Sequence, residues 1–488
     1  MTTNIAKNTA LLTFAYIAQK LFSFVYFTLI ARLIGAEGIG KFTFAVSFTT
    51  IMAVFIDLGI TNVLIRESAK YKEKANTYLN NIISAKALFS FLTYLGLIVI
   101  INLLGKDDLT KIMVYISGFV MVLDSFTLSF WGIFRGHHNL KYESIGVIFN
   151  QVIIIALGTT GILLGWPIYV LVLALLGGSL FNLIYSYTLI RKKLNYQLKF
   201  EFNKIVLVSF FKIAVPFALA AVFTRIYGFI DQVLLSILID DKHLGYYSVA
   251  YKITYALQFI PAAFIAAVYP AMSNYYLNSK EKLAGIFERS MFFLMIIAVP
   301  IIFGIISLAD KYIYFLYTAE FAPTILALQI LIISLFFGFL NFPVGSLLNA
   351  CDKQAKNTLN MGITMVLNIV LNLILIPKFL HLGAAIASLI TLIVLFALNL
   401  FYAPQIIKFD YKYLLIKFLK TLLAGILMMI VILSLKTQVN FVILTVLGGV
   451  VYFIAMYLFR GITISEVKEL YFSIFKKKYE PQSAVTDN

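Results

Sequence analysis

The chain has 488 residues, of which 61% are hydrophobic, 16% aromatic and only 12% charged. Soluble proteins carry roughly twice that share of charged residues, so the composition excludes a large soluble enzyme. The single cysteine, Cys351, excludes a disulfide-stapled secreted scaffold, and the four histidines show no spacing typical of metal ligands. In so apolar a chain, the net charge of +17 indicates cytoplasmic loops of a membrane protein, and no nucleic-acid partner is expected.

Fourteen apolar runs, each long enough to cross a bilayer as a helix, follow one another along the chain. Their hydrophobicity is continuous rather than alternating, which predicts helices and not a transmembrane β-barrel. The predicted fold is therefore all-α, a polytopic integral membrane protein with 14 transmembrane helices and no extramembrane catalytic domain. The predicted spans are 8–31, 42–64, 81–103, 112–134, 144–165, 168–190, 208–238, 247–271, 290–308, 323–347, 358–377, 382–403, 413–435 and 441–459.

The distribution of basic residues predicts the orientation. If the N-terminus is cytoplasmic, most of the 39 lysines and arginines fall in cytoplasmic loops and ends, as the positive-inside rule requires. Both termini are then cytoplasmic. The segment 460–488 is predicted to be a basic cytoplasmic tail. Its lysines, Lys476 to Lys478, are interpreted either as a plain positive-inside anchor or as a binding site for anionic membrane lipids.

An internal repeat divides the chain. A shift of 205 residues places 20–47 on 225–252 without a gap, and it matches Lys20 with Arg225 and Gly40 with Gly245. Because the shift spans six predicted helices, the repeat is parallel. It predicts two six-helix lobes, an N-lobe over 1–203 and a C-lobe over 204–403, with two extra C-terminal helices in 404–459.

Three charged residues are predicted near the middle of the membrane, where a charge is costly and requires an explanation. Lys20 and Arg225 each lie 13 residues from the cytoplasmic Lys7 and Lys212, about 20 Å along a helix. Asp124 lies equally far from Lys111, on the other side. A structural Lys20–Asp124 lock is one interpretation, and a cationic cavity for an anionic group such as a diphosphate is the other. Asp124 is then a candidate for ion coupling.

Four further charged residues within the spans are candidates for structural ion pairs. The estimated depths predict that Lys86 pairs with Asp57 in the N-lobe. They also predict that Lys252 pairs with Asp231 in the C-lobe.

Several short motifs resemble, in the expected order, signatures of the lipid-linked oligosaccharide flippases. These proteins (O-antigen-unit, polysaccharide-biosynthesis transporters) belong to the multidrug/oligosaccharidyl-lipid/polysaccharide exporter superfamily. The resemblance covers residues 8 to about 403, and single motifs are weak whereas the ordered set is strong. The motifs are RLIGAEGIG (32–40), DLGI (57–60) with Arg66-Glu67, Phe134-Arg135-Gly136, YPAMS (269–273), NACDK (349–353), and Asn368, Asn372, Ile376, Pro377 with GAAIA (383–387).

The resemblance implies a transporter, not an enzyme. Its expected substrate is an undecaprenyl-diphosphate-linked oligosaccharide, carried from the inner to the outer leaflet of the bacterial cytoplasmic membrane for surface polysaccharide synthesis. Lys20, Arg225 and Arg66 are the predicted substrate-binding residues, acting in alternating access by two lobes. No cofactor is expected beyond a coupling proton or sodium ion, and a polysaccharide polymerase and a chain-length regulator are expected partners.

Other functions remain open. A peptidoglycan-precursor flippase also has fourteen spans and central basic residues, and no residue excludes it. A drug or cation exporter requires an anionic cavity, which the two deep basic residues oppose. A membrane glycosyltransferase or polymerase requires external carboxylates, and the longest predicted external connection, 309–322, offers only Asp310 and Glu320.

Overall fold

A computed structural model describes the backbone of residues 2–462 and the side chains from Leu11 to Ile462. The predicted lipid-binding lysines of the tail lie outside the described residues. Within these residues every regular element is helical, as predicted. The helices are α1 (Thr2–Met52), α2 (Val54–Asp57), α3 (Ile60–Lys70), α4 (Ala75–Leu103), α5 (Asp108–Gly136), α6 (Lys141–Leu163), α7 (Val170–Leu194), α8 (Lys204–Leu238), α9 (Asp241–Leu257), α10 (Phe259–Asn278), α11 (Lys280–Leu316), α12 (Thr324–Ala350), α13 (Gln354–Phe379), α14 (His381–Tyr402), α15 (Tyr411–Leu435) and α16 (Phe441–Leu458), with short 3₁₀ turns at Lys72–Lys74, Ala319–Phe321 and Ala403–Gln405.

Thirteen helical runs in the described part of the chain are long and apolar enough to cross a membrane. The first of them, Leu11–Asp57, has 47 residues and is about twice as long as a bilayer core is thick. It is interrupted at Gly35, whose φ of 72° and ψ of −177° are not helical. α1 therefore holds the first predicted span and the beginning of the second, which continues through α2 into α3, and the prediction of fourteen agrees with the structure.

The connection predicted at 32–41 is much shorter than expected, because only Gly35 leaves the helix. A side chain at this φ would be strained, which explains a glycine here. Helices also extend beyond several predicted spans: α11 starts at Lys280 rather than at 290. Its Ser279 N-cap hydroxyl accepts from the Lys282 amide, so a polar cap and not the edge of the apolar run sets its start.

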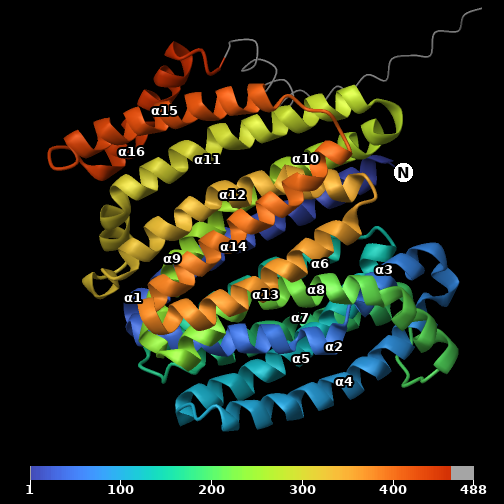
Figure 1. The fold of residues 1–488 in the computed structure, drawn as a ribbon. Helices are drawn as coiled ribbons and strands as arrows, with labels where there is room; N and C mark the ends of the chain where they lie inside the picture. Colours follow the sequence, from blue (N-terminus) through green and yellow to red (C-terminus); the bar gives the residue numbers. More distant parts are fainter. Residues whose placement is uncertain (1, 463–488) are drawn as a thin grey trace, which may run out of the picture.

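The helices form one elongated bundle (Figure 1). α4 and α5 lie at one edge, where α4 packs on α5 and α5 packs on α7. α15 and α16 lie at the opposite edge, where α15 packs on both α16 and α11. Between the edges, α1 packs on α9 and thereby connects the two predicted lobes.

The α1–α9 crossing is pseudo-symmetric. A Cβ atom added at Gly40 would lie 1.6 Å from the Asp241 carbonyl oxygen, and one added at Gly245 would lie 1.9 Å from the Ala36 carbonyl oxygen. The repeat shift relates Gly40 to Gly245 and Ala36 to Asp241, so each repeat presents the same two positions to the other. The glycines allow the two backbones to touch, which is how small residues promote helix packing in membranes.

The repeat also reproduces a helix break. The helix after Gly35 is interrupted at Ala53, between α1 and α2, and its repeat mate is interrupted at Gln258, between α9 and α10. These positions are again 205 residues apart. A further break in the N-lobe follows at Leu58 and Gly59, which have φ values of 42° and 73°.

Candidate functional site

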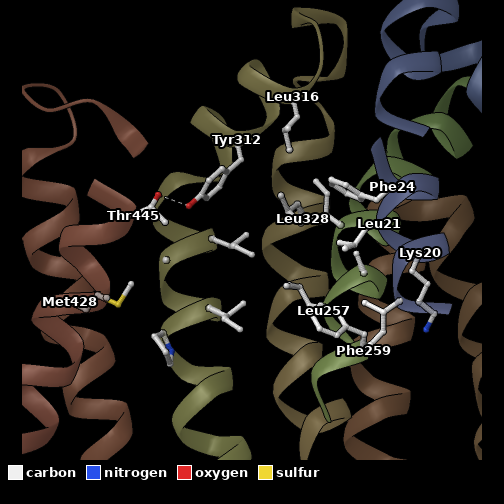
Figure 2. A pocket seen from close by; sticks show the side chains of 18 residues that line it. Lys20, Leu21, Phe24, Leu257, Phe259, Tyr312, Leu316, Leu328, Met428 and Thr445 are labelled. Atoms are coloured by element: carbon white, nitrogen blue, oxygen red, sulfur yellow. Dashed lines mark hydrogen bonds between the residues drawn. The ribbon is translucent and has the colours of Figure 1, made fainter. Parts of the chain in front are cut away.

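Three spaces adjoin one another, and each is lined by residues from both predicted lobes of the chain. The first, which we call the apolar pocket, has a volume of about 540 Å³ and is framed by α1, α9–α12, α15 and α16. Its walls are aliphatic and aromatic, and Lys20, Tyr312 and Thr445 are its polar side chains. Figure 2 shows Met428 and Thr445 at one end of the apolar pocket and Lys20 at the other. The hydroxyl groups of Thr445 and Tyr312 form a hydrogen bond of 2.7 Å.

The second space, the lysine cavity, has a volume of about 240 Å³ and is lined by Lys20, Lys252, Ser23, Tyr255, Gln19 and Gln151, among others. Lys252 Nζ on α9 donates to Ser23 Oγ on α1 over 3.0 Å. Lys20 Nζ lies 5.5 Å from the centre of the Tyr255 ring. Neither lysine forms an ion pair with a described residue, so the cavity holds two uncompensated cations.

The third space, the polar cavity, has a volume of about 540 Å³ and lies mainly within the first half of the chain, between α1, α2, α5, α6 and α7. Arg225 on α8 also lines it and has no hydrogen bond or ion pair with a described residue. Asp124 on α5 faces the same cavity, and the Ser179 hydroxyl donates to its carboxylate.

The three spaces follow one another in a defined order. The apolar pocket and the lysine cavity share Lys20 and Phe24, whereas the lysine cavity and the polar cavity share Gln19 and Gln151. An apolar region, a cationic region and a hydrogen-bonding region therefore adjoin one another in this spatial order. Lys20 lies where the first two meet.

Two of the predicted ion pairs have different outcomes. Lys86 Nζ lies 2.5 Å from Asp57 Oδ1, with Lys86 completely buried, so this predicted pair is present. The predicted pair of Lys252 with Asp231 is wrong, because Lys252 points across to α1 whereas Asp231 points into the C-lobe. The depth estimate had placed both at one level, but depth along a helix does not determine which face a side chain occupies.

The predicted structural lock between Lys20 and Asp124 is also absent. Lys20 and Asp124 line different cavities and form no ion pair within the described part of the chain. Lys20 and Arg225 do not line one common cavity either, but occupy the two adjoining ones. Sequence reasoning missed Lys252 as a third cavity cation because it had assigned this lysine a partner.

Asp231 is the centre of a buried polar cluster in the C-lobe. Its carboxylate accepts hydrogen bonds from Asn372 Nδ2 at 2.7 Å, from the Tyr247 hydroxyl at 2.9 Å and from Ser388 Oγ at 2.6 Å. Asn368 lies one turn before Asn372, and the side-chain oxygens of both are buried without a hydrogen-bond partner. Unused buried acceptors beside a carboxylate are a suitable environment for a small cation or a proton.

A network of charges closes one end of the bundle, which we call the α4–α5 end after the connection it contains. Lys41 Nζ lies 3.0 Å from Asp107 Oδ2 and 3.7 Å from Asp241 Oδ2. Lys106 Nζ lies 3.2 Å from Asp241 Oδ1 and donates to the Ser236 carbonyl over 2.5 Å. These contacts join residues before 110 to residues after 235, so the network ties the two predicted lobes together.

Asp107, in the connection between α4 and α5, is stabilised in its charged form. Burial acts to raise the pKa of this carboxyl group, but the hydrogen bond from Thr110 and the contact with Lys41 outweigh it. The pKa of Asp107 is therefore held below its ordinary value. The network keeps its charges at neutral pH.

The two acidic residues that the enzyme alternative depended on have structural partners. Asp310 Oδ1 lies 2.7 Å from Lys436 Nζ, in the connection between α15 and α16. Glu320 Oε1 accepts the Ala36 amide over 3.0 Å, at the point where the helix resumes after Gly35. A carboxylate at a helix N-terminus is favoured by the helix dipole. Neither residue is thereby available as the paired acid and base of a transferase.

A comparison with protein families decides the classification. The family described as "Polysaccharide biosynthesis protein" matches residues 5–276, more than half of the chain. The chain belongs to this family. The MatE family also matches, over residues 216–374, which is consistent with a member of the multidrug/oligosaccharidyl-lipid/polysaccharide exporter superfamily.

Curated relatives of this polysaccharide biosynthesis protein include two with informative names. A "Probable low-salt glycan biosynthesis flippase Agl15" of Haloferax volcanii is 22% identical over 415 residues, which cover 84% of this chain and 86% of the relative. The "Capsular polysaccharide biosynthesis protein CapF" of Staphylococcus aureus is 24% identical over 396 residues, which cover 79% of this chain and 96% of the relative.

Solved structures share the fold. A structure of "Lipid II flippase MurJ, inward closed conformation" aligns with a TM-score of 0.78 at 18% identity, covering 92% of this chain and 98% of that chain. An inward-facing multidrug resistance MATE family transporter aligns with a TM-score of 0.66 at 15% identity, covering 79% of this chain and 94% of that chain. The protein is therefore a multi-pass membrane protein with the fold of this exporter superfamily.

The family signatures fall partly in structural positions and partly at a cavity, because the DLGI motif contributes Asp57 to the wall of the polar cavity. Arg135 Nε donates to Glu143 Oε2 over 2.9 Å, and the Tyr16 hydroxyl donates to Glu143 Oε1 over 2.7 Å, which joins α5, α6 and α1. Arg66, predicted to bind substrate, lies on α3 with half its side chain exposed and with Glu67 as its neighbour at 3.6 Å. It lines none of the three adjoining spaces.

Proposed function

We propose that this protein is a flippase that carries undecaprenyl-diphosphate-linked oligosaccharide units across the bacterial cytoplasmic membrane for surface polysaccharide synthesis. The observation that carries the proposal is the order of the three spaces. A lipid-linked oligosaccharide consists of an apolar tail, a diphosphate and a sugar, in that order. The apolar pocket, the lysine cavity and the polar cavity offer matching environments in the same order.

The diphosphate is assigned to Lys20 and Lys252, with Arg225 contributing from the polar cavity. Cationic donors and phosphate oxygens form charge-assisted hydrogen bonds, which are stronger than neutral ones. Because Lys20 comes from α1 and Lys252 from α9, a bound diphosphate would contact both predicted lobes. Binding between lobes is what alternating access requires, because rocking of the lobes then moves the site from one leaflet to the other.

The expected orientation places both termini in the cytoplasm and the α4–α5 end outside. The charge network at that end then closes the outer side, and substrate enters from the inner leaflet. The names of the relatives and the fold agree with a transporter rather than an enzyme. The two uncompensated lysines favour an anionic cargo over the cations of a drug exporter.

The coupling ion is assigned to Asp231 rather than to Asp124. Asp231 is buried beside the unused oxygens of Asn368 and Asn372, whereas Asp124 faces the open polar cavity. Asp231→Asn should remove the dependence of transport on a sodium or proton gradient. Transport in this variant that still responds fully to the gradient would contradict the assignment. We also expect a polysaccharide polymerase and a chain-length regulator to act on the exported unit.

Binding of a prenyl diphosphate tests the diphosphate site directly. Purified protein in nanodiscs should bind farnesyl diphosphate, and Lys20→Ala, Lys252→Ala and Arg225→Ala should each weaken binding by about tenfold or more, the size of one charged hydrogen bond. Lys378→Ala, at an exposed lysine remote from the cavities, is the matched control. Equal affinity in all four variants would refute the site.

A further inference from the structure

The polar cavity contains an acidic group that diphosphate binding does not use. Asp57 and Asp124 both line it, but only Asp57 is neutralised, by the buried Lys86. Asp124 has Ser179 as its hydrogen-bond donor and no cationic partner among the described residues. Its carboxylate therefore faces the cavity with accepting capacity left over, since an ionised carboxylate has about four acceptor sites.

A neighbouring amide on α6 extends the hydrogen-bonding wall. Gln151 lines both the polar cavity and the lysine cavity, and it is 5% exposed. Its side chain has no hydrogen bond to a described residue. A buried amide without a partner costs free energy unless a ligand or water satisfies it. A ligand that fills the cavity is therefore favoured when it supplies donors to Asp124 and to Gln151.

From this geometry we propose that Asp124 and Gln151 form a sugar-reading subsite that selects the first sugar after the diphosphate. The selected sugar is neutral or carries an amino or amide N–H, and an acidic sugar is rejected. This inference rests on the proposed function and names the sugar class that the same site accepts. The volume of about 540 Å³ lies within the range of small-molecule sites.

The physical basis is a difference between donors and acceptors. Hydroxyl and amide N–H groups donate to Asp124 and to the Gln151 side-chain oxygen. A uronic acid instead brings a second carboxylate, which repels Asp124 in a space shielded from bulk water. Arg225 offers such a carboxylate one cation in the same cavity, but that cation is already required by the diphosphate. Selection by repulsion as well as by fit is a common route to specificity.

The test compares three probes on the intact protein in nanodiscs: farnesyl diphosphate, a prenyl diphosphate linked to N-acetylhexosamine, and one linked to a hexuronic acid. The unaltered protein should bind the neutral glycolipid at least tenfold more tightly than the acidic one. Asp124→Asn should reduce that preference to about twofold or less and leave affinity for farnesyl diphosphate unchanged. Gln151→Ala should weaken binding of the neutral glycolipid by about tenfold, and more than it weakens binding of farnesyl diphosphate.

Controls separate this inference from the proposed function. Asp108→Asn, at a highly exposed carboxylate of the α4–α5 end, should change no affinity. If farnesyl diphosphate binds but the sugar makes no difference, the sugar-reading subsite is refuted and the diphosphate site stands. If no prenyl diphosphate binds, the proposed function itself fails. A uniform loss of all three affinities in both Asp124→Asn and Gln151→Ala would show that these side chains only support the fold, and would also overturn the inference.

Discussion

The α1–α9 crossing offers a substitution whose effect can be worked out from the structure. A Cβ atom in Gly40→Ala would lie 1.6 Å from the Asp241 carbonyl oxygen. Ordinary van der Waals contact needs about 3.5 Å, so the helices must separate by about 2 Å. Both partners are backbone, so no side-chain rotation can relieve the clash. Overpacking of this kind costs about 1–3 kcal/mol, which lowers the population of the closed crossing by roughly tenfold to a hundredfold.

Thiol labelling measures the opening at the α4–α5 end. In a background where the buried Cys351 is replaced by alanine, Val120→Cys places a thiol in the wall of the polar cavity. A membrane-impermeant maleimide added outside should label this cysteine about tenfold faster when Gly40→Ala is also present. Gly245→Ala should act in the same way, because its Cβ would lie 1.9 Å from the Ala36 carbonyl oxygen.

A matched glycine provides the control. Gly228 lies within α8, and a Cβ atom added there would meet nothing within 4 Å. Gly228→Ala should therefore leave the labelling rate unchanged. If Gly40→Ala also leaves it unchanged while the protein remains folded, the crossing is not the contact that closes this end, and the reasoning from backbone contact is refuted.

Two further predictions concern charged contacts. Asp241→Asn removes the carboxylate shared by two lysines at the α4–α5 end, and it should likewise speed labelling from outside; unchanged labelling would show that the charges do not hold this end closed. Because the pKa of Asp107 is depressed, its contribution to the closed state should persist from pH 8 to 5 and be lost only below its ordinary value of 3.8. The ratio of the labelling rates with and without Asp107→Asn should therefore stay constant from pH 8 to 5, since the ratio cancels the changing thiolate fraction of the labelled cysteine. Lys86→Met leaves the partly buried carboxylate of Asp57 without its partner and should destabilise the protein by about 1–3 kcal/mol, whereas the double variant with Asp57→Asn should recover most of the loss in thermal unfolding. A double variant no more stable than the single one would argue against a specific ion pair.

Hydrophobicity and charge made much of the fold predictable. A long, continuously apolar run satisfies its backbone hydrogen bonds in a membrane by forming an α-helix, so the helical class and the fourteen spans could be predicted directly. The repeat was detectable because Gly40 and Gly245 are both required at one close contact. Span limits were less predictable, because caps such as Ser279 extend helices beyond the apolar core.

Side-chain partners were harder to predict than the positions of charges. The depth of each residue along its helix correctly predicted the ion pair between Lys86 and Asp57. The same reasoning wrongly predicted an ion pair between Lys252 and Asp231. Rotation about each helix axis depends on packing against neighbours that the sequence does not specify. The order of the three spaces, and the role of Lys252 in the middle one, required the three-dimensional structure.

The location of the substrate in cells tests the central claim most directly. Cells depleted of this protein should accumulate the completed undecaprenyl-diphosphate-linked oligosaccharide in the cytoplasmic leaflet. The unaltered protein should restore its export, and the triple variant Lys20→Ala, Lys252→Ala, Arg225→Ala should not. Normal appearance of every such glycolipid in the outer leaflet of depleted cells would contradict the account.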